Sequence, residues 1–507
     1  MELIVISDLH LSVGYNDQTG RHSRNEDFFF DEEFKRFLEY LQKENSPKKH
    51  LIIAGDLFDF LQVDGDKVRE LYEDGMMRKL KEEEAQESHE EEKKRESYKQ
   101  WRGPFENEIT KREKKYGLST EQDKTVWKLG VIAKGHSVFF QALGNFLSAG
   151  NRLSIITGNH DIELFGEKVR KELVNRIVEF KNSQVTDQQI EGRIDFYPWF
   201  YYDKDYKTYI EHGNQYDTLN SFRYFLYPLL EHGSDKLWLP FGSFFVRYFF
   251  NKLETSNPFA DNIKPMTKYM QWAWGEDKWQ FLKNIFLYLP TMLQLFLKGG
   301  KLSRAQKKLL EKENDKKLDE SAQKFGLPSD AIKNIYSLMA SPLTRNKLSI
   351  ILYFAGTFFP IITLIVFIVL FALSQFFRFS FWTALSSFAL LIVPIAKWVL
   401  SKFFQKDPFE KILPKIKEHL EYAGIDVQTI VFGHTHDPDI RIVDPDLRYF
   451  NTGTWTTVFS EEERIIREAK QFAFVWIKEV RGKPQASLLR WNQNLNQPER
   501  LILFDQK

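Results

Sequence analysis

The sequence predicts an α/β fold that is split in two by a long helical insertion. Two observations predict the α/β part: short apolar runs of strand length alternate with segments of helical periodicity through residue 217, and more such runs follow residue 424. A third observation predicts the insertion, because two far longer uncharged runs lie between these regions. The expected organisation is therefore 1–217 and 424–507 as one folded unit, with 218–423 inserted into it.

Five apolar runs are predicted to be buried strands, and each ends in a short polar cluster that contains Asp, His or Asn. The five runs are Leu3–Ile6, Leu51–Ala54, Leu153–Ile156, Tyr209–Glu211 and Thr429–Phe432. Three later runs, at 449–452, 472–479 and 486–491, predict strands that close a sheet through hairpins. Sites in layered α/β folds assemble at strand ends, so the five polar clusters are candidate site residues.

The segments between the early strands read as helices. Apolar residues recur at helical spacing in Phe28–Lys43 and in Trp127–Leu147. The charge-dense stretch 66–115 is interpreted as a solvated helical excursion, and 298–325 as a solvated helix or linker.

Two apolar runs predict a membrane hairpin. Leu348–Phe377 contains no charged residue, and Arg378 alone separates it from a second uncharged run that ends at Ala396. About 20 apolar residues cross the hydrocarbon layer, so spans at about 348–377 and 379–400 are expected. The alternative is a hairpin buried in a protein core.

The flanking charges predict the orientation of this hairpin. Arg345 and Lys347 precede the first span, whereas Lys397 and further lysines end or follow the second, and the connector holds only Arg378. The positive-inside rule then places both outer ends, and with them the α/β unit, on the cytoplasmic side of a two-span, multi-pass membrane protein. The first residues lack the basic start and the long apolar run of a signal peptide.

Aromatic residues are mixed with basic ones in two further segments of the insertion, 236–253 and 279–298. This pattern is typical of helices that lie at a membrane interface or form a lid. Packing on the catalytic core is the alternative, and the pattern alone does not separate the two.

Composition excludes several classes of function. The 71 Lys and Arg residues nearly balance the 70 Asp and Glu residues, for a formal net charge of +1, so no nucleic-acid partner is predicted. The chain has no cysteine, which excludes disulfides, thiolate metal sites and a cysteine nucleophile.

The polar clusters together offer a metal-ligand set. Five of the chain's 11 histidines fall in them, together with carboxylate and amide side chains. The candidate ligands are Asp8, His10, Asp56, Asn159, His212, His434 and His436. Such mixed ligands suit Mn²⁺, Fe or Zn²⁺, and seven exceed what one ion needs. Two divalent ions, Mn²⁺ in the first place, are therefore expected as cofactors; a pair about 3.5–4 Å apart is the usual arrangement for hydrolysis at phosphorus by a metal-held hydroxide.

The motifs at these positions resemble those of the calcineurin-like metallophosphoesterase superfamily. They stand in the family's order: Asp8-x-His10, Gly55-Asp56-x-x-Asp59, Gly158-Asn159-His160-Asp161, His212-Gly213 and Gly433-His434-x-His436. Any one of these motifs is weak evidence, whereas all five in order, each after an apolar strand, are highly specific. The resemblance implies a four-layer αββα sandwich in which two mixed sheets pack face to face with helices outside.

The resemblance also implies roles for the residues. Asp8, His10 and His436 would hold one metal ion, Asn159, His212 and His434 the other, and Asp56 would bridge both. His160 would be a catalytic residue beside the substrate phosphate, and Asp59 would orient its imidazole.

A narrower resemblance is to the branch that includes UDP-2,3-diacylglucosamine pyrophosphatases. It rests on Asp8-Leu9-His10-Leu11, on Gly55–Asp59 and on Asn451–Trp455. Those enzymes carry a helical lid for acyl chains in the gap that holds the insertion here. They have Arg where this chain has His160, which favours a phosphomonoester or phosphodiester substrate.

The expected function is hydrolysis of a phosphate ester or pyrophosphate by a membrane-anchored enzyme, with a lipid-linked molecule as a candidate substrate. A membrane-tethered hydrolase of soluble nucleotides or phosphoproteins is the alternative, and a non-catalytic scaffold is a third class.

Overall fold

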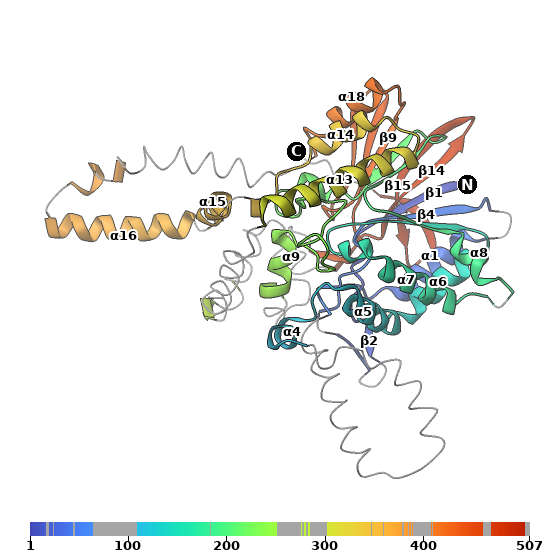
Figure 1. Cartoon of the computed structure of the whole chain (residues 1–507), viewed down its shortest axis with the longest axis horizontal. Coiled ribbons are helices and arrows are strands. Elements are labelled where there is room, and N and C mark those ends of the chain that lie inside the picture. Colours follow the sequence, from blue (N-terminus) through green and yellow to red (C-terminus); the bar gives the residue numbers. More distant parts are fainter. Residues whose placement is uncertain are drawn as a thin grey trace, which may run out of the picture.

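Figure 1 shows the computed structural model of the chain, in which two sheets and their covering helices form a body from which a helical arm projects. The structure describes 1–63 except 17–19, 24, 44 and 45; 109–250 except 183; 302–377 except 346 and 358; 409–501 except 460–467; and the positions 275, 278, 279, 282, 283, 380–383, 385, 386, 388 and 407.

The larger sheet has seven strands in the order β16-β15-β14-β1-β4-β5-β6. Its parallel half consists of β1 (Glu2–Ile6), β4 (Lys49–Ala54), β5 (Arg152–Ile156) and β6 (Ile194–Tyr197). Its antiparallel half consists of β14 (Ala473–Val480), β15 (Lys483–Asn492) and β16 (Gln497–Arg500). The two halves meet where β14 pairs with β1, so the two ends of the chain build one sheet.

The second sheet has five strands in the order β10-β11-β9-β8-β7. They are β7 (Phe200–Asp203), β8 (Thr208–Glu211), β9 (Thr429–Phe432), β10 (Pro438–Asp444) and β11 (Leu447–Thr452). Two small ribbons pair β2 (Tyr15–Asn16) with β3 (Arg21–His22) and β12 (Thr457–Phe459) with β13 (Glu468–Lys470). Because β8 pairs with β9 across the insertion, this sheet too joins the two parts of the unit.

Side-chain alternation along the strands separates the apolar core into layers. Leu3 and Val5 of β1 share one buried cluster with Val431 and Phe450 of the other sheet, whereas Ile4 points into a different cluster that contains helix residues. Successive side chains of a strand point to opposite faces, so one face of each sheet meets the other sheet and the opposite face meets helices.

The helices cover the outer faces of both sheets. The larger sheet is covered by α1 (Asp31–Leu41), α5 (Gln122–Gly135), α6 (Ser137–Ser148), α7 (Glu167–Glu179) and, at its edge, α8 (Asp187–Glu191). The smaller sheet is covered by α13 (Arg304–Lys324), α14 (Ser329–Ser337) and α18 (Leu413–Tyr422). Shorter helices occur in the connections along the chain. They include α4 (Lys111–Tyr116), η2 (Ile162–Phe165), η3 (Asn214–Tyr216) and η6 (Leu343–Arg345). The predicted mixed α/β fold is confirmed.

One prediction was wrong, because a segment predicted as one helix forms two helices in the structure. The apolar periodicity of 127–147 predicts a single helix, but the structure has α5 and α6, which meet at His136. His136 leaves the helical conformation (φ −119°, ψ 38°) because its buried ring forms ion pairs with two residues far away in sequence, Glu26 and Asp31.

The helices in the described part of the insertion have different boundaries from the interfacial segments and membrane spans that the sequence predicts. Segment 236–253 contains α9 (Phe241–Phe245) and η4 (Val246–Phe250), and Leu237, Phe241 and Phe245 are buried in the core beside the smaller sheet, as the packing alternative holds. The first predicted span is divided between α15 (Lys347–Thr357) and α16 (Phe359–Phe377).

Within the part of the chain that the structure describes, no helix has both the length and the apolar character needed to cross a membrane. Most of the second predicted span, 379–400, lies outside the described residues, as do most of the predicted excursion at 66–115 and most of segment 279–298.

The His136 cluster gives a prediction about stability. Burial on its own would lower the pKa of His136, but the carboxylates of Glu26 (3.3 Å) and Asp31 (3.1 Å) raise it to about 10. The charged ring therefore stabilises the fold fully below its unfolded pKa of about 6.5, and this contribution is lost as the pH rises through about 10. We expect His136→Gln to cost about 3–5 kcal/mol at pH 6 and much less above pH 10, measured by denaturant unfolding.

His50→Gln is the matched control for this experiment. His50 is also buried, but burial lowers its pKa to about 4, so its ring is neutral in both states above pH 7. Its substitution should change stability by an amount that does not vary between pH 7 and 10. A pH-independent loss in His136→Gln would contradict a charged His136.

Candidate metal centre

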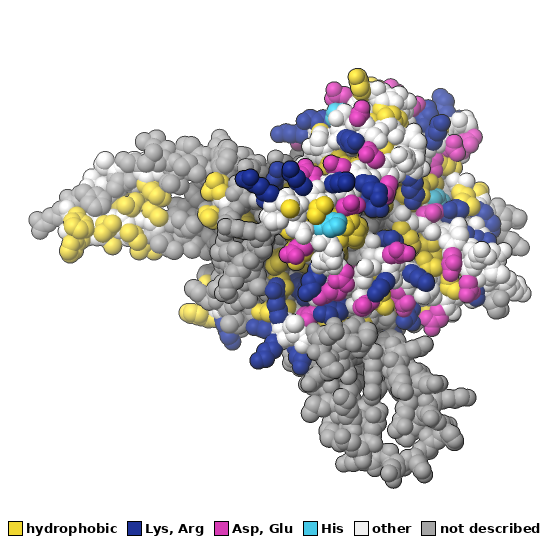
Figure 2. Space-filling view, in the orientation of Figure 1, with side chains coloured by type: hydrophobic (Ala, Val, Ile, Leu, Met, Phe, Trp, Pro, Cys, Tyr) yellow, Lys and Arg dark blue, Asp and Glu magenta, His cyan; other side chains and the backbone are white. Residues whose placement is uncertain are grey.

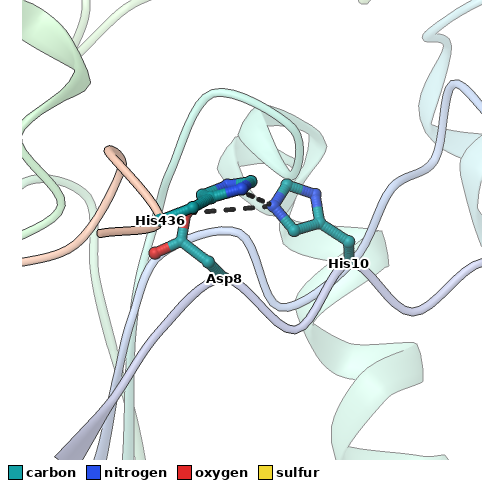
Figure 3. Close-up of side chains that lie close together, drawn as sticks. All are labelled: Asp8, His10 and His436. Carbon is teal, nitrogen blue, oxygen red and sulfur yellow. Dashed lines mark hydrogen bonds and ion pairs between the residues drawn. The ribbon is translucent and has the colours of Figure 1, made fainter. Parts of the chain in front are cut away.

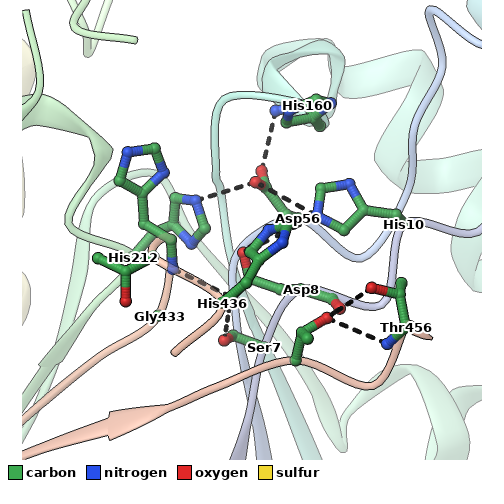
Figure 4. Close-up of polar contacts among 12 residues, drawn as sticks. Ser7, Asp8, His10, Asp56, His160, His212, Gly433, His436 and Thr456 are labelled. Carbon is green, nitrogen blue, oxygen red and sulfur yellow. Dashed lines mark hydrogen bonds and ion pairs between the residues drawn. The ribbon is translucent and has the colours of Figure 1, made fainter. Parts of the chain in front are cut away.

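The polar residues predicted from the strand ends lie together at one edge of the two sheets. The turns that follow β1, β4 and β5 come from the larger sheet, and those that follow β8 and β9 come from the smaller one. Figure 4 shows their side chains converging on Asp56 and Asp8. All nine predicted site residues take part in the contacts that follow.

The first group consists of Asp8, His10 and His436, shown in Figure 3. Nε2 of His436 lies 3.1 Å from Oδ1 of Asp8, Nε2 of His10 lies 3.8 Å from the same oxygen, and the two Nε2 atoms are 3.2 Å apart. Oδ1 of Asp8 is buried and makes no hydrogen bond with any described residue. The three ligand atoms lie close enough together to hold a metal ion.

The second group consists of Asp56, His212 and His434, with Asn159 beside it. Nε2 of His212 lies 3.0 Å from Oδ2 of Asp56 and 3.3 Å from Oδ1 of Asn159. The other ring nitrogen of His212 is 2.9 Å from the carbonyl oxygen of Ala54, which leaves Nε2 to face the carboxylate.

Asp56 belongs to the second group but also faces the first. Its Oδ2 faces His212 and is also 3.9 Å from Nε2 of His10, which belongs to the first group. A carboxylate with contacts on both sides can hold two ions at once.

His160 and Asp59 form a pair beside the two groups, and together with His10 they make a third cluster that could hold a metal ion. Nδ1 of His160 lies 2.5 Å from Oδ2 of Asp59, and the His160 and His10 rings meet edge to face at 4.6 Å. Asp59 is fully buried, and its Oδ1 accepts hydrogen bonds from the backbone N–H groups of Leu61 and Gln62. The His160 side chain keeps 17% of its surface exposed, so it can meet a substrate while Asp59 holds its ring.

The backbone at the site is strained. Non-glycine residues seldom adopt positive φ, and each such residue costs about 1–3 kcal/mol. Nine non-glycine residues of the described part do so, and five of them are predicted metal ligands: Asp8, His10, Asp56, His434 and His436. Such a concentration indicates that the turns are shaped to direct ligands rather than to minimise strain.

Close packing requires glycine at several motif positions, and Gly158 is the one that faces the central carboxylate. A Cβ atom at Gly158 would lie 2.1 Å from Oδ1 of Asp56, so a side chain there would displace the central carboxylate. The backbone N–H of His160 can in turn donate to the same Oδ1 at 2.9 Å.

The electrostatics of the site favour a cation. Burial on its own would raise the pKa of Asp8 and of Asp56, yet the surrounding imidazoles hold both well below their ordinary range. Burial would likewise lower the pKa of His212, but the Asp56 carboxylate raises it to about 9. Both buried carboxylates therefore attract positive charge, and divalent cations could supply it in place of protonated imidazoles.

Two residues of the site had no predicted role. Asp161 is buried, and its carboxylate accepts from the N–H groups of Gly158 (2.7 Å) and Leu57 (2.8 Å), which joins two of the ligand turns. Its place in the Gly158–Asp161 motif is a signal that could have revealed it. Asp217, whose Oδ2 is 3.2 Å from Nε2 of His434, follows His212 by five residues and has no such signal.

The segment Asn451–Trp455 also contacts the ligand turns. Oγ1 of Thr454 donates to the carbonyl oxygen of Asp8 at 2.7 Å, and the N–H of Trp455 donates to the same oxygen at 3.2 Å. This late segment therefore supports the conformation of the first turn.

Comparison of the chain with family models, with curated proteins and with solved structures found no match.

Proposed function

We propose that this chain is a dinuclear metal-dependent phosphoesterase of the calcineurin-like metallophosphoesterase type. The observation that carries the proposal is the two neighbouring ligand groups, which Asp56 connects through its contacts with His212 and His10, with the His160–Asp59 pair next to them. The stacked sheets with helices on their outer faces agree with the sandwich that this assignment requires.

In this proposal Asp8, His10 and His436 hold one divalent ion, and Asn159, His212 and His434 hold the other. Bound there, two such ions lower the pKa of water and neutralise charge on a phosphoryl group. His160, oriented by Asp59, stabilises the transferring phosphoryl group or protonates the leaving oxygen. A scaffold without activity would not need this set of strained ligand turns.

A lipid-linked substrate is the form of the proposal that the arrangement favours. The site lies at the end of β1 that is remote from the N-terminus, and α9 and α15 lie on that side of the body (Figure 1). Oγ of Ser243 in α9 is 3.5 Å from the carbonyl oxygen of Asn159. The insertion therefore reaches the site itself.

The projecting arm exposes apolar side chains that water would not favour. Ile351 of α15 and Ile368, Phe371 and Phe376 of α16 each keep more than half of their surface exposed, and Figure 2 shows apolar side chains along the arm. We propose that the arm enters a bilayer and that the catalytic body lies on its cytoplasmic face, where a lipid headgroup could reach the site.

The test is a hydrolysis screen with the full chain in detergent. After removal of metal by a chelator, we expect no activity on bis(p-nitrophenyl) phosphate, and recovery when Mn²⁺ is added back. In a second panel, lipid-linked phosphates should give a higher kcat/KM than nucleotides or a phosphopeptide.

His434→Ala is the matched inactive variant in both panels. Absence of hydrolysis with every divalent metal tested would contradict the assignment as an enzyme. A preference for soluble substrates would instead support the alternative, in which the arm is only a tether.

A further inference from the structure

His434 has a carboxylate neighbour outside the predicted ligand set. Oδ2 of Asp217 lies 3.2 Å from Nε2 of His434. An imidazole has two nitrogen atoms, so a ring that bonds a carboxylate through Nε2 would bind a metal ion through Nδ1. Such a partner sets the tautomer and orientation of a metal-binding histidine and raises its basicity.

Asp217 itself is held in a defined position. Its Oδ1 accepts from the N–H of Leu219 at 2.9 Å, and its Oδ2 accepts from the side-chain amide of Asn220 at 2.7 Å. The carbonyl oxygen of Asp217 accepts from the N–H of Ser221 at 2.8 Å. The two side-chain contacts orient the carboxylate toward His434.

The insertion contacts this same turn. The N–H of Gly242 in α9 donates to the carbonyl oxygen of Leu219 at 3.0 Å. A Cβ atom at Gly242 would lie 2.1 Å from Oδ1 of Asn220, so only glycine allows α9 to approach so closely. The amide that this methyl group would displace is the one that bonds to Asp217.

The turn is also joined to the base of the apolar arm. The N–H of Leu343, which lies shortly before α15, donates to the carbonyl oxygen of Thr218 at 3.0 Å. The ring of Phe241 in α9 meets that of Tyr353 in α15 edge to face at 5.5 Å. The turn that begins the insertion thus connects α9 and the base of the arm to Asp217 and His434.

We propose that Asp217 is a positioning residue for His434 in metal binding, and that α9 keeps Asp217 in place through Asn220. The inference rests on the proposed function only in that His434 binds a metal ion. It adds that the insertion supports the metal centre structurally, beyond any role as a lid or an anchor.

The test measures Mn²⁺ binding by the full chain, by calorimetry and by electron paramagnetic resonance, rather than turnover. Asp217→Asn keeps the size of the side chain but removes its charge. We expect it to lower the affinity for one of the two Mn²⁺ ions by about 10- to 100-fold. Asp217→Glu keeps the charge and should recover part of that affinity. Wild-type affinity at both sites in Asp217→Asn would overturn the role of Asp217.

The contribution of α9 is tested by Gly242→Ala, which should lower the affinity for the same Mn²⁺ ion. Gly192→Ala is its control, because Gly192 has a right-handed helical backbone and its nearest neighbour would be 3.3 Å from the added methyl group. If Gly242→Ala binds both ions as the wild type does, α9 does not support the site. Two normal Mn²⁺ sites without hydrolysis of any phosphate ester would contradict the proposed function but leave this inference intact.

Discussion

Asp56→Ala is expected to abolish hydrolysis and to reduce metal binding at both sites. Asp56 contacts a histidine of each group, at 3.0 Å to His212 and 3.9 Å to His10. Its loss also leaves buried imidazoles without the carboxylate that they face, which weakens the positions of the other ligands. Metal content by elemental analysis and kcat on a chromogenic phosphodiester would measure the two effects.

Asp195→Ala is a suitable control for this change. Asp195 lies on β6 and pairs with Arg152 at 2.7 Å, with about a third of each side chain exposed, so its loss should alter stability and metal content little. Two bound ions and normal activity in Asp56→Ala would refute the assignment of Asp56 as the shared ligand.

His160→Ala is expected to lower kcat by about 10²–10⁴ while both metal ions remain bound. The reason is that Nδ1 of His160 is bonded to Asp59, and the predicted ligands of both ions remain in place without this ring. The cluster of His10, Asp59 and His160 could itself hold a metal ion, so the metal analysis also tests whether His160 is a ligand. Kinetics in saturating Mn²⁺, with metal analysis of the same samples, would separate the two quantities.

Asp59→Ala provides the second half of this experiment. If Asp59 acts only by orienting His160, the double variant should be no slower than His160→Ala alone, because the two residues work as a unit. Loss of metal in His160→Ala would show that His160 is itself a ligand. Additive losses in the double variant would show that Asp59 acts separately from His160.

The break between α5 and α6 shows where sequence periodicity reaches its limit. The apolar spacing from Trp127 to Leu147 continues through His136, whereas Lys134, Gly135 and Ser137 are a local stop-and-start signal that the periodicity overrides. The structure ends α5 there because Glu26 and Asp31, both more than 100 residues away, hold the ring. A contact between distant segments outweighs helical propensity, which contributes only fractions of a kcal/mol per residue.

The mixed α/β fold and the residue types at the candidate site could be predicted from the sequence alone. Short apolar runs bounded by polar residues mark buried strands, because burial of such runs is what stabilises a sheet. The polar clusters at their ends likewise indicate which side chains could act as metal ligands, since the chemistry of carboxylate and imidazole groups does not depend on the fold.

Only the tertiary structure decided how those donors are grouped. Asp8 and His436 lie at opposite ends of the chain, and they meet because β14 pairs with β1 and β8 pairs with β9. The positive φ angles of five ligands and the contact of Asp217 with His434 have no local signal, because neighbouring turns impose them. The sequence thus determined which chemical groups the site contains, whereas long-range strand pairing and the packing of the insertion decided their geometry, since distances between remote residues depend on the whole fold.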